Sequence, residues 1–148
     1  MYPNILVPID GSETSTRGLE EAIQVAKDQD SRLRLFHIVN DHVLDTGYCN
    51  GTNAGDINER LRANGNQVLR AAEDLVRKRG VAVETVVQEF IGRTAADAIL
   101  EQARTWPADL IVMGTHGRRG LRRLAMGSDA ECVVRDASVP VLLVRALL

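Results

Sequence analysis

Residues 108–114 read Ala-Asp-Leu-Ile-Val-Met-Gly, an apolar run that ends directly in a glycine. Leu110 to Met113 contains no alternating polar residue, which is typical of a strand buried on both faces of a parallel sheet. Other short runs rich in Val, Ile and Leu lie at 5–9, 33–39, 81–87 and 139–144. The sequence therefore predicts five strands, of which residues 110–113 form the fourth.

Amphipathic stretches separate these runs and predict helices at 19–26, 61–76, 94–103 and 128–137. Gly80 is expected to end the second helix, and capping-box-like pairs, Thr94 with Asp97 and Ser128 with Glu131, to begin the third and fourth. The polar segment 40–56 is predicted to be a loop. Strands that alternate with helices favour an α/β fold, a parallel sheet with helices on both faces, in a single domain over residues 1–148.

Composition excludes several classes of function. The chain has 148 residues, a formal net charge of −2 and only 3% aromatic residues, so nothing attracts it as a whole to nucleic acid or to anionic membranes. No secretion signal or membrane-spanning stretch is recognised, and the expected location is the cytoplasm. Cys49 and Cys132 are expected to be reduced, and the three scattered histidines suggest no metal cluster.

Two loops follow predicted strands at the edge where parallel sheets bind ligands. The first is Asp10-Gly11-Ser12, and the second runs from Gly114 to a helix start at Gly127-Ser128. Glycines let backbone N–H groups approach an anion, and a helix amino terminus favours phosphate. The second loop has neither the Gly-Lys-Ser/Thr ending of a P-loop nor the GxGxxG pattern. It predicts an anion site of another kind.

Gly114, Gly117 and Gly127-Ser128 form the pattern G-x2-G-x9-G-S, which resembles the ATP-binding signature of the universal stress protein family. The resemblance extends over nearly the whole chain, through the blocks 5–12, 37–39, 108–114 and 140–144. It implies a single-domain, open parallel sheet of five strands in the order 3-2-1-4-5, with helices on both faces, of the adenine nucleotide alpha hydrolase-like kind. That order brings Asp10 and Gly114 to one crevice.

The resemblance also implies a binding role for individual residues. Adenine or ribose is expected at Pro8, Asp10 and the backbone of Ile38, and the ribose and first phosphates at Met113, Gly114, His116 and Gly117. The outer phosphates are expected at Gly127, Ser128, Asp129 and Ala130, with Arg118 as a further phosphate contact. The expected ligand is ATP, or ADP or AMP.

Asp129 and Ala130 depart from the family pattern, which often has an apolar or hydroxyl residue at the first position and a hydroxyl at the second. A carboxylate ~4 Å from a phosphate costs about 4 kcal/mol at an effective dielectric near 20, before screening. We therefore expect triphosphate binding to depend on Mg²⁺, held near Asp10 or Asp129. Without the metal, ADP or AMP should be favoured.

Simpler structural roles remain open for the same residues. Asp10 is also suited to cap the following turn, and Ser128 to cap its helix. The glycines suit plain turns, and the arginines 118, 119, 122 and 123 a solvated loop face. No aromatic platform favours nucleic acid. His37, within an apolar strand, is expected to be a hydrogen-bonded core residue, and His116 a backbone contact.

The sequence assembles no nucleophile with a base and an orienting group, so no catalytic residue is assigned. The preferred function is a nucleotide-dependent regulator, a dimeric switch or adaptor read by an unidentified protein partner. A weak Mg²⁺-dependent ATPase and a nucleotide-free interaction protein are the alternatives. The apolar strand 139–144 lies at a sheet edge in the family order, and a homodimer is expected to form through it.

Overall fold

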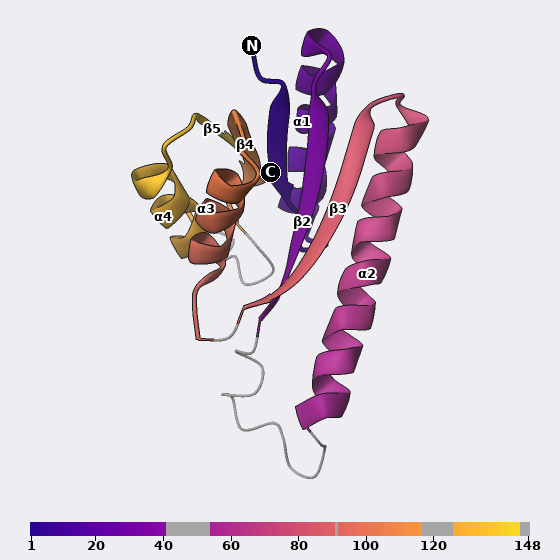
Figure 1. Ribbon diagram of the computed structural model, residues 1–148, viewed down its shortest axis with the longest axis vertical. Coiled ribbons are helices and arrows are strands. Elements are labelled where there is room, and N and C mark those ends of the chain that lie inside the picture. The colour runs from indigo at the N-terminus through magenta and orange to yellow at the C-terminus, as the bar shows by residue number, and fades with distance from the viewer. Residues whose placement is uncertain (41–53, 91, 117–125, 146–148) are drawn as a thin grey trace.

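The structure is a computed structural model in which residues 1–40, 54–90, 92–116 and 126–145 are described. Its strands are β1 (Asn4–Pro8), β2 (Arg32–Asn40), β3 (Ala82–Phe90), β4 (Leu110–Gly114) and β5 (Val141–Val144). Its helices are α1 (Glu13–Gln29), α2 (Ala54–Lys78), α3 (Ala95–Thr105) and α4 (Ser128–Asp136). All strand pairs are parallel and their order is β3-β2-β1-β4-β5, which confirms the predicted fold (Figure 1).

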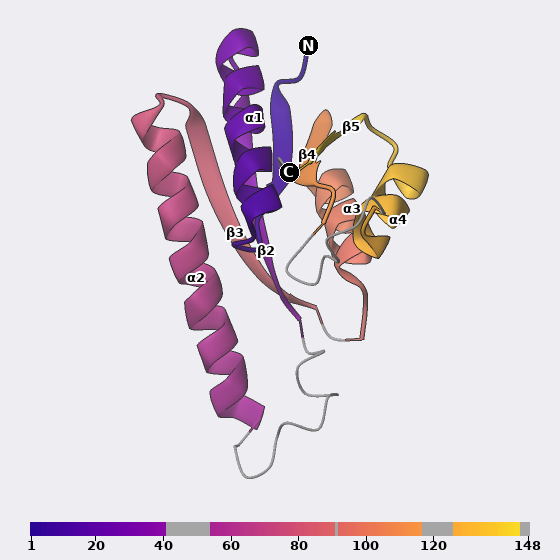
Figure 2. The ribbon, with the colours of Figure 1, turned by 180° about the vertical axis from the view of Figure 1, so that it is seen from behind.

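Alternate residues of the central strands enter two separate cores. Ile5 and Val7 of β1 pack with α1 and α2, whereas Leu6 packs with α3 and α4. The two views from opposite sides show the same arrangement, with α1 and α2 on one face and α3 and α4 on the other (Figures 1 and 2). This is the period of two that a strand imposes on its side chains.

β4 confirms the interpretation of its sequence. Leu110 and Val112 enter the first core and Ile111 and Met113 the second, and each of the four is less than a tenth exposed. A strand buried on both faces has no place for polar alternation. β5 lies at the edge of the sheet, beyond β4, as the family order implied.

The first two helices start earlier than the apolar spacing predicted. Ser12 caps α1 by accepting a hydrogen bond from the Ser15 N–H at 3.2 Å, and the first turn buries Thr14 and Ser15. Polar residues that are buried carry no hydrophobic period, so the sequence pattern missed this turn. α2 begins at Ala54, inside the predicted loop 40–56; residues 41–53 lie outside the described residues.

The two predicted capping boxes have different outcomes. Thr94 and Asp97 form theirs, as expected. The expectation that Ser128 caps α4 is wrong, because Gly127 occupies the cap position and makes no side-chain cap bond. The Glu131 N–H donates to the Gly127 carbonyl at 3.0 Å, so the helix starts one residue earlier and leaves the Ser128 side chain exposed.

Two further findings concern the described part of the chain alone. Within it, no helix is both long and apolar enough to cross a membrane. The same residues contain no group of three or more His, Cys, Asp or Glu placed to hold a metal ion. Cys132 is a free, half-buried thiol, and Cys49 lies outside the described residues.

Candidate functional site

The carboxyl ends of β1 and β4 lie side by side. Ile5 pairs with Leu110 and Leu6 with Ile111, so the two strands are direct neighbours in parallel register. From β1 the chain continues to β2 and β3 on one side, and later returns to β4 and β5 on the other. This reversal brings the Asp10 and Gly114 ends to one edge of the sheet, where open α/β sheets bind ligands.

Asp10 is built into the start of α1. Its Oδ1 accepts the Ser12 N–H at 2.8 Å, and its own N–H donates to Ser15 Oγ at 3.2 Å. The capping role that the sequence left open is therefore present. The second carboxylate oxygen, Oδ2, has no partner among the described residues, and Asp10 is half-buried. One oxygen is thus engaged in the turn while the other is available to a ligand.

β2 extends beyond the end of β1. Pro8, the last residue of β1, pairs with Phe36, and the Ile9 N–H donates to the Phe36 carbonyl at 2.8 Å. Among the described strands, Ile38 has a register partner only in β3, Gln88. The main chain of Ile38 on the β1 side therefore has no strand partner, which is the condition for main-chain recognition of a ligand there.

His37 is a hydrogen-bonded core histidine, as the sequence predicted. Only 7% of it is exposed, and its Nδ1 lies 2.7 Å from the Ile9 carbonyl oxygen. Gly65 of α2 lies directly against its ring, since a Cβ added at Gly65 would be 2.7 Å from His37 Nε2. His37 therefore joins β2 to α2 and to the end of β1.

Gly114 has a packing role that sequence reasoning missed. A Cβ at Gly114 would lie 2.8 Å from Thr14 Cβ and 2.9 Å from the Thr14 carbonyl carbon. Thr14 Oγ1 also donates a hydrogen bond to the His116 carbonyl. The amino end of α1 thus holds the first turn after β4, and the small residues Thr14, Ser15 and Gly18 were the available signal. Met113 contributes its side chain to the second core, and its main chain pairs with Leu143 of β5.

The amino end of α4 presents three open backbone donors. The Gly127 N–H donates to the Thr115 carbonyl at 2.8 Å, and the first bond within the helix is that of Glu131 to Gly127. The N–H groups of Ser128, Asp129 and Ala130 have no acceptor among the residues that the structure describes. Unpaired donors at the positive end of a helix dipole favour an anion.

Asp129 does not have the surroundings that its sequence position suggested. Its Oδ1 accepts a hydrogen bond from the Ala96 N–H of α3 at 3.2 Å. This hydrogen bond holds the carboxylate against α3, but a main-chain N–H carries no counter-charge. The charge that motivated the expected Mg²⁺ dependence therefore remains.

The structure describes only some of the remaining predicted residues. His116 is one of these, and its Nδ1 lies 2.9 Å from Oγ1 of Thr115, a buried neighbour. Gly117 and Arg118 lie outside the described residues, as do Arg119, Arg122 and Arg123.

A hollow of about 670 Å³ lies at the amino ends of the strands, and the residues that line it include Asn4, Lys27 and Gly80. Asp10 follows the carboxyl end of β1, and Gly114 is the last residue of β4. The hollow is therefore at the opposite end of the sheet from the candidate site.

Comparisons with known proteins find relatives that match nearly the whole chain. The profile of the universal stress protein family matches residues 1–145. Universal stress protein MJ0531 of Methanocaldococcus jannaschii is 34% identical over 149 residues, which cover 98% of this chain and 83% of that protein. A solved protein of the family from Burkholderia pseudomallei superposes with a TM-score of 0.79 at 32% identity, over 98% of this chain and 97% of that one.

A more distant solved structure is a universal stress protein in complex with cAMP. It has a TM-score of 0.68 at 24% identity, over 97% of each chain, and on that likeness it shares the fold. The family match covers almost every residue, and a relative above 30% identity is aligned over nearly the full chain. The protein thus belongs to the universal stress protein family.

Proposed function

We propose that this protein is an adenine-nucleotide-binding regulator of the stress response, with ATP bound at the carboxyl ends of β1 and β4. The observation that carries the proposal is the set of three open N–H groups at residues 128–130, at the same end of the sheet as Asp10. Such donors suit the oxygens of a polyphosphate. The cAMP bound by a structural relative supports an adenine nucleotide as the ligand.

In the proposed complex, the nucleotide extends from the ends of β1 and β2, past β4, to the start of α4. Adenine and ribose lie near Pro8, the open Oδ2 of Asp10 and the backbone of Ile38. Met113, Gly114 and His116 lie beside the ribose and the first phosphate. Gly127 and the first turn of α4 hold the outer phosphates. The roles of Gly117 and Arg118 rest on the sequence pattern alone.

Magnesium is proposed to assist the binding of a triphosphate. The Asp129 carboxylate is held against α3 by a neutral N–H, so its charge still repels a bound triphosphate. Mg²⁺ that binds with ATP is therefore proposed near Asp10 or Asp129, and ADP or AMP are proposed as the ligands without the metal. Calorimetry with and without Mg²⁺ tests this, and equal ATP affinity in both would contradict it.

Regulation is proposed to act through assembly. A cytoplasmic homodimer that pairs at β5 would carry two nucleotide sites, and an unidentified protein partner would read their occupancy. The edge position of β5 supports pairing, because an uncovered strand edge offers free N–H and C=O groups to a second copy.

Slow hydrolysis of ATP is the second candidate. The open Oδ2 of Asp10 favours it, since a carboxylate oxygen is a ligand that Mg²⁺ accepts. A regulator releases phosphate far more slowly than an ordinary enzyme, which turns over at about 1 per second or faster. Phosphate release by purified protein therefore separates the two.

The decisive experiment identifies nucleotide released when freshly purified protein is denatured, followed by calorimetry with ATP. A bulky substitution, Gly127→Phe, should abolish binding because it fills the space beside the donors of residues 128–130. Lys27→Ala, in the hollow at the other end of the sheet, is the control and should bind like the unchanged protein. Protein that neither carries nor binds adenine nucleotide contradicts the proposal and favours the nucleotide-free alternative.

A further inference from the structure

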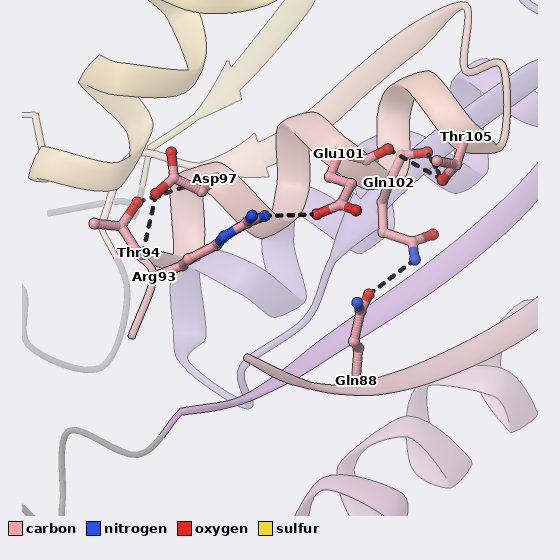
Figure 3. Close-up of polar contacts among 7 residues, drawn as sticks. All are labelled: Gln88, Arg93, Thr94, Asp97, Glu101, Gln102 and Thr105. Atoms are coloured by element: carbon pink, nitrogen blue, oxygen red, sulfur yellow. Dashed lines mark hydrogen bonds and ion pairs between the residues drawn. The ribbon is translucent and has the colours of Figure 1, made fainter. Parts of the chain in front are cut away.

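The starts of α3 and α4 are joined by one hydrogen bond. Ala96 is in the first turn of α3, and its N–H donates to the carboxylate of Asp129, in the first turn of α4. The two residues are 33 positions apart in the sequence. Figure 3 shows the α3 side of this junction, where Thr94 and Asp97 form the capping box.

Asp129 completes a cap that α3 cannot complete alone. The capping box pairs the Asp97 N–H with Thr94 Oγ1 and the Thr94 N–H with Asp97 Oδ2, each at 3.2 Å. The Ala96 N–H lies between these groups and receives its acceptor from the other helix. A helix start leaves N–H groups that need such acceptors, and here a neighbouring element supplies one.

The junction lies beside the second core, and Asp129 itself is half-buried. Ala96 and Ala130 are 2% and 3% exposed, and both belong to the cluster that also contains Ile99 and Val133. Small side chains on both helices let the two backbones approach closely. The carboxylate also lies at the positive ends of two helix dipoles, which stabilise its charge.

We infer that Asp129 is a positioning residue: its carboxylate fixes the amino end of α4 against α3 and does not contact the nucleotide. The hydrogen bond itself stands independently of any ligand, whereas the effect on affinity rests on the proposed function. The bond joins the start of α4, which carries the 128–130 donors, to the start of α3. Asp129, which departs from the family pattern, therefore has a structural role: it joins α3 and α4.

The test compares two substitutions at Asp129 with the matching two at Glu131, an exposed acidic residue in the same turn. Asp129→Ala removes the acceptor, whereas Asp129→Asn keeps an acceptor oxygen and removes the charge. Amide hydrogen exchange in nucleotide-free protein should show faster exchange of the Ala96 N–H in D129A and near-normal exchange in D129N. E131A and E131Q should leave the exchange rate of the Ala96 N–H unchanged.

The second readout separates positioning from a general loss of stability. In D129A the affinity for ATP should fall about fivefold or more, which is the effect of one ordinary hydrogen bond. The affinity for adenosine, which makes no phosphate contact, should be preserved. D129N should bind ATP with the same affinity as E131Q. Both variants lose one negative charge, and D129N still has an oxygen that can accept the Ala96 N–H.

Two results overturn the inference. One is an unchanged hydrogen-exchange rate of the Ala96 N–H in D129A, because the bond to Asp129 then does not stabilise the start of α3. The other is tighter ATP binding in both D129A and D129N, because the charge then faces the phosphates. Wild-type protein that binds no nucleotide contradicts the proposed function, while the exchange result still supports or refutes the tie between α3 and α4.

Discussion

At the scale of single residues, Gly114 and Gly18 face each other across the contact between α1 and β4. A Cβ on Gly114 would overlap Thr14, whereas a Cβ on Gly18 would lie 3.5 Å from the Gly114 nitrogen, an ordinary contact. Gly114→Ala should therefore lower the free energy of unfolding by about 1–3 kcal/mol, the usual cost of overpacking.

Gly18→Ala is the matched control for this prediction. Gly18 lies inside α1, where alanine is preferred over glycine by about 0.5–1 kcal/mol, so the variant should be as stable as the unchanged protein or more stable. Urea unfolding followed by the fluorescence of the single Trp106 measures both variants. Equal destabilisation by the two substitutions would contradict the close contact between Gly114 and Thr14.

Single residues also show where sequence reasoning reached its limit. Asp10 and Gly114 could be placed together because strand order alone decides which loops meet. The partner of Asp129 could not be predicted, because Ala96 offers only a main-chain N–H and nothing in its side chain marks it. The resemblance implied a contact with the outer phosphates at that position, and the structure adds a hydrogen bond from a distant residue.

At the scale of elements, α3 offers two threonines with different roles, both drawn in Figure 3. Thr94 Oγ1 accepts the Asp97 N–H and caps the helix, while Thr105 Oγ1 donates to the Glu101 carbonyl near its end. Thr94→Ala should destabilise the protein by about 1 kcal/mol, because it leaves a helix-start donor unsatisfied. Thr105→Ala should have little effect, since it removes no cap. Thermal unfolding compares the two, and a larger loss for Thr105→Ala would contradict these roles.

The packing of α2 on β2 depends on a glycine opposite a histidine. Gly65→Ala places a Cβ against the ring of His37, which its hydrogen bond to Ile9 keeps from moving. We expect a loss of about 1–3 kcal/mol in unfolding free energy. In a His37→Ala background the same substitution should cost almost nothing, since the ring is gone. A double-mutant cycle measures this coupling, and additive effects would argue against the contact.

Strands were predicted more closely than helix starts, for a physical reason. β4 is buried on both faces, so its sequence is apolar throughout and unmistakable. The first turn of α1 buries Thr14 and Ser15, whose polar side chains hide the helical period. The start of α4 was misassigned by one residue, because Ser128 satisfied the preference for a cap while Gly127 held the position.

At the scale of the whole molecule, β5 ends the sheet on one side and β3 on the other. Leu142 of β5 is 37% exposed, an apolar side chain on an uncovered edge strand. We predict a homodimer that pairs at this strand, so Leu142→Lys should give a monomer by sedimentation at micromolar concentration, since charge on an edge strand opposes pairing. Thr85→Lys, an exposed site on the opposite edge strand, should leave the dimer intact. A monomeric unchanged protein would refute the dimer.

The proposed function depends on an adenine nucleotide that is expected to bind where the ends of β1 and β4 meet the first turn of α4. A titration of isotopically labelled protein with ATP, followed by amide chemical shifts, locates the bound nucleotide without any substitution. We predict the largest changes at residues 128–130, with further changes at Asp10 and Ile38 and none near Lys27 or Gly80 at the opposite end of the sheet. Shifts confined to that opposite end, or none at saturating ATP, would contradict a nucleotide site at the carboxyl ends of the strands.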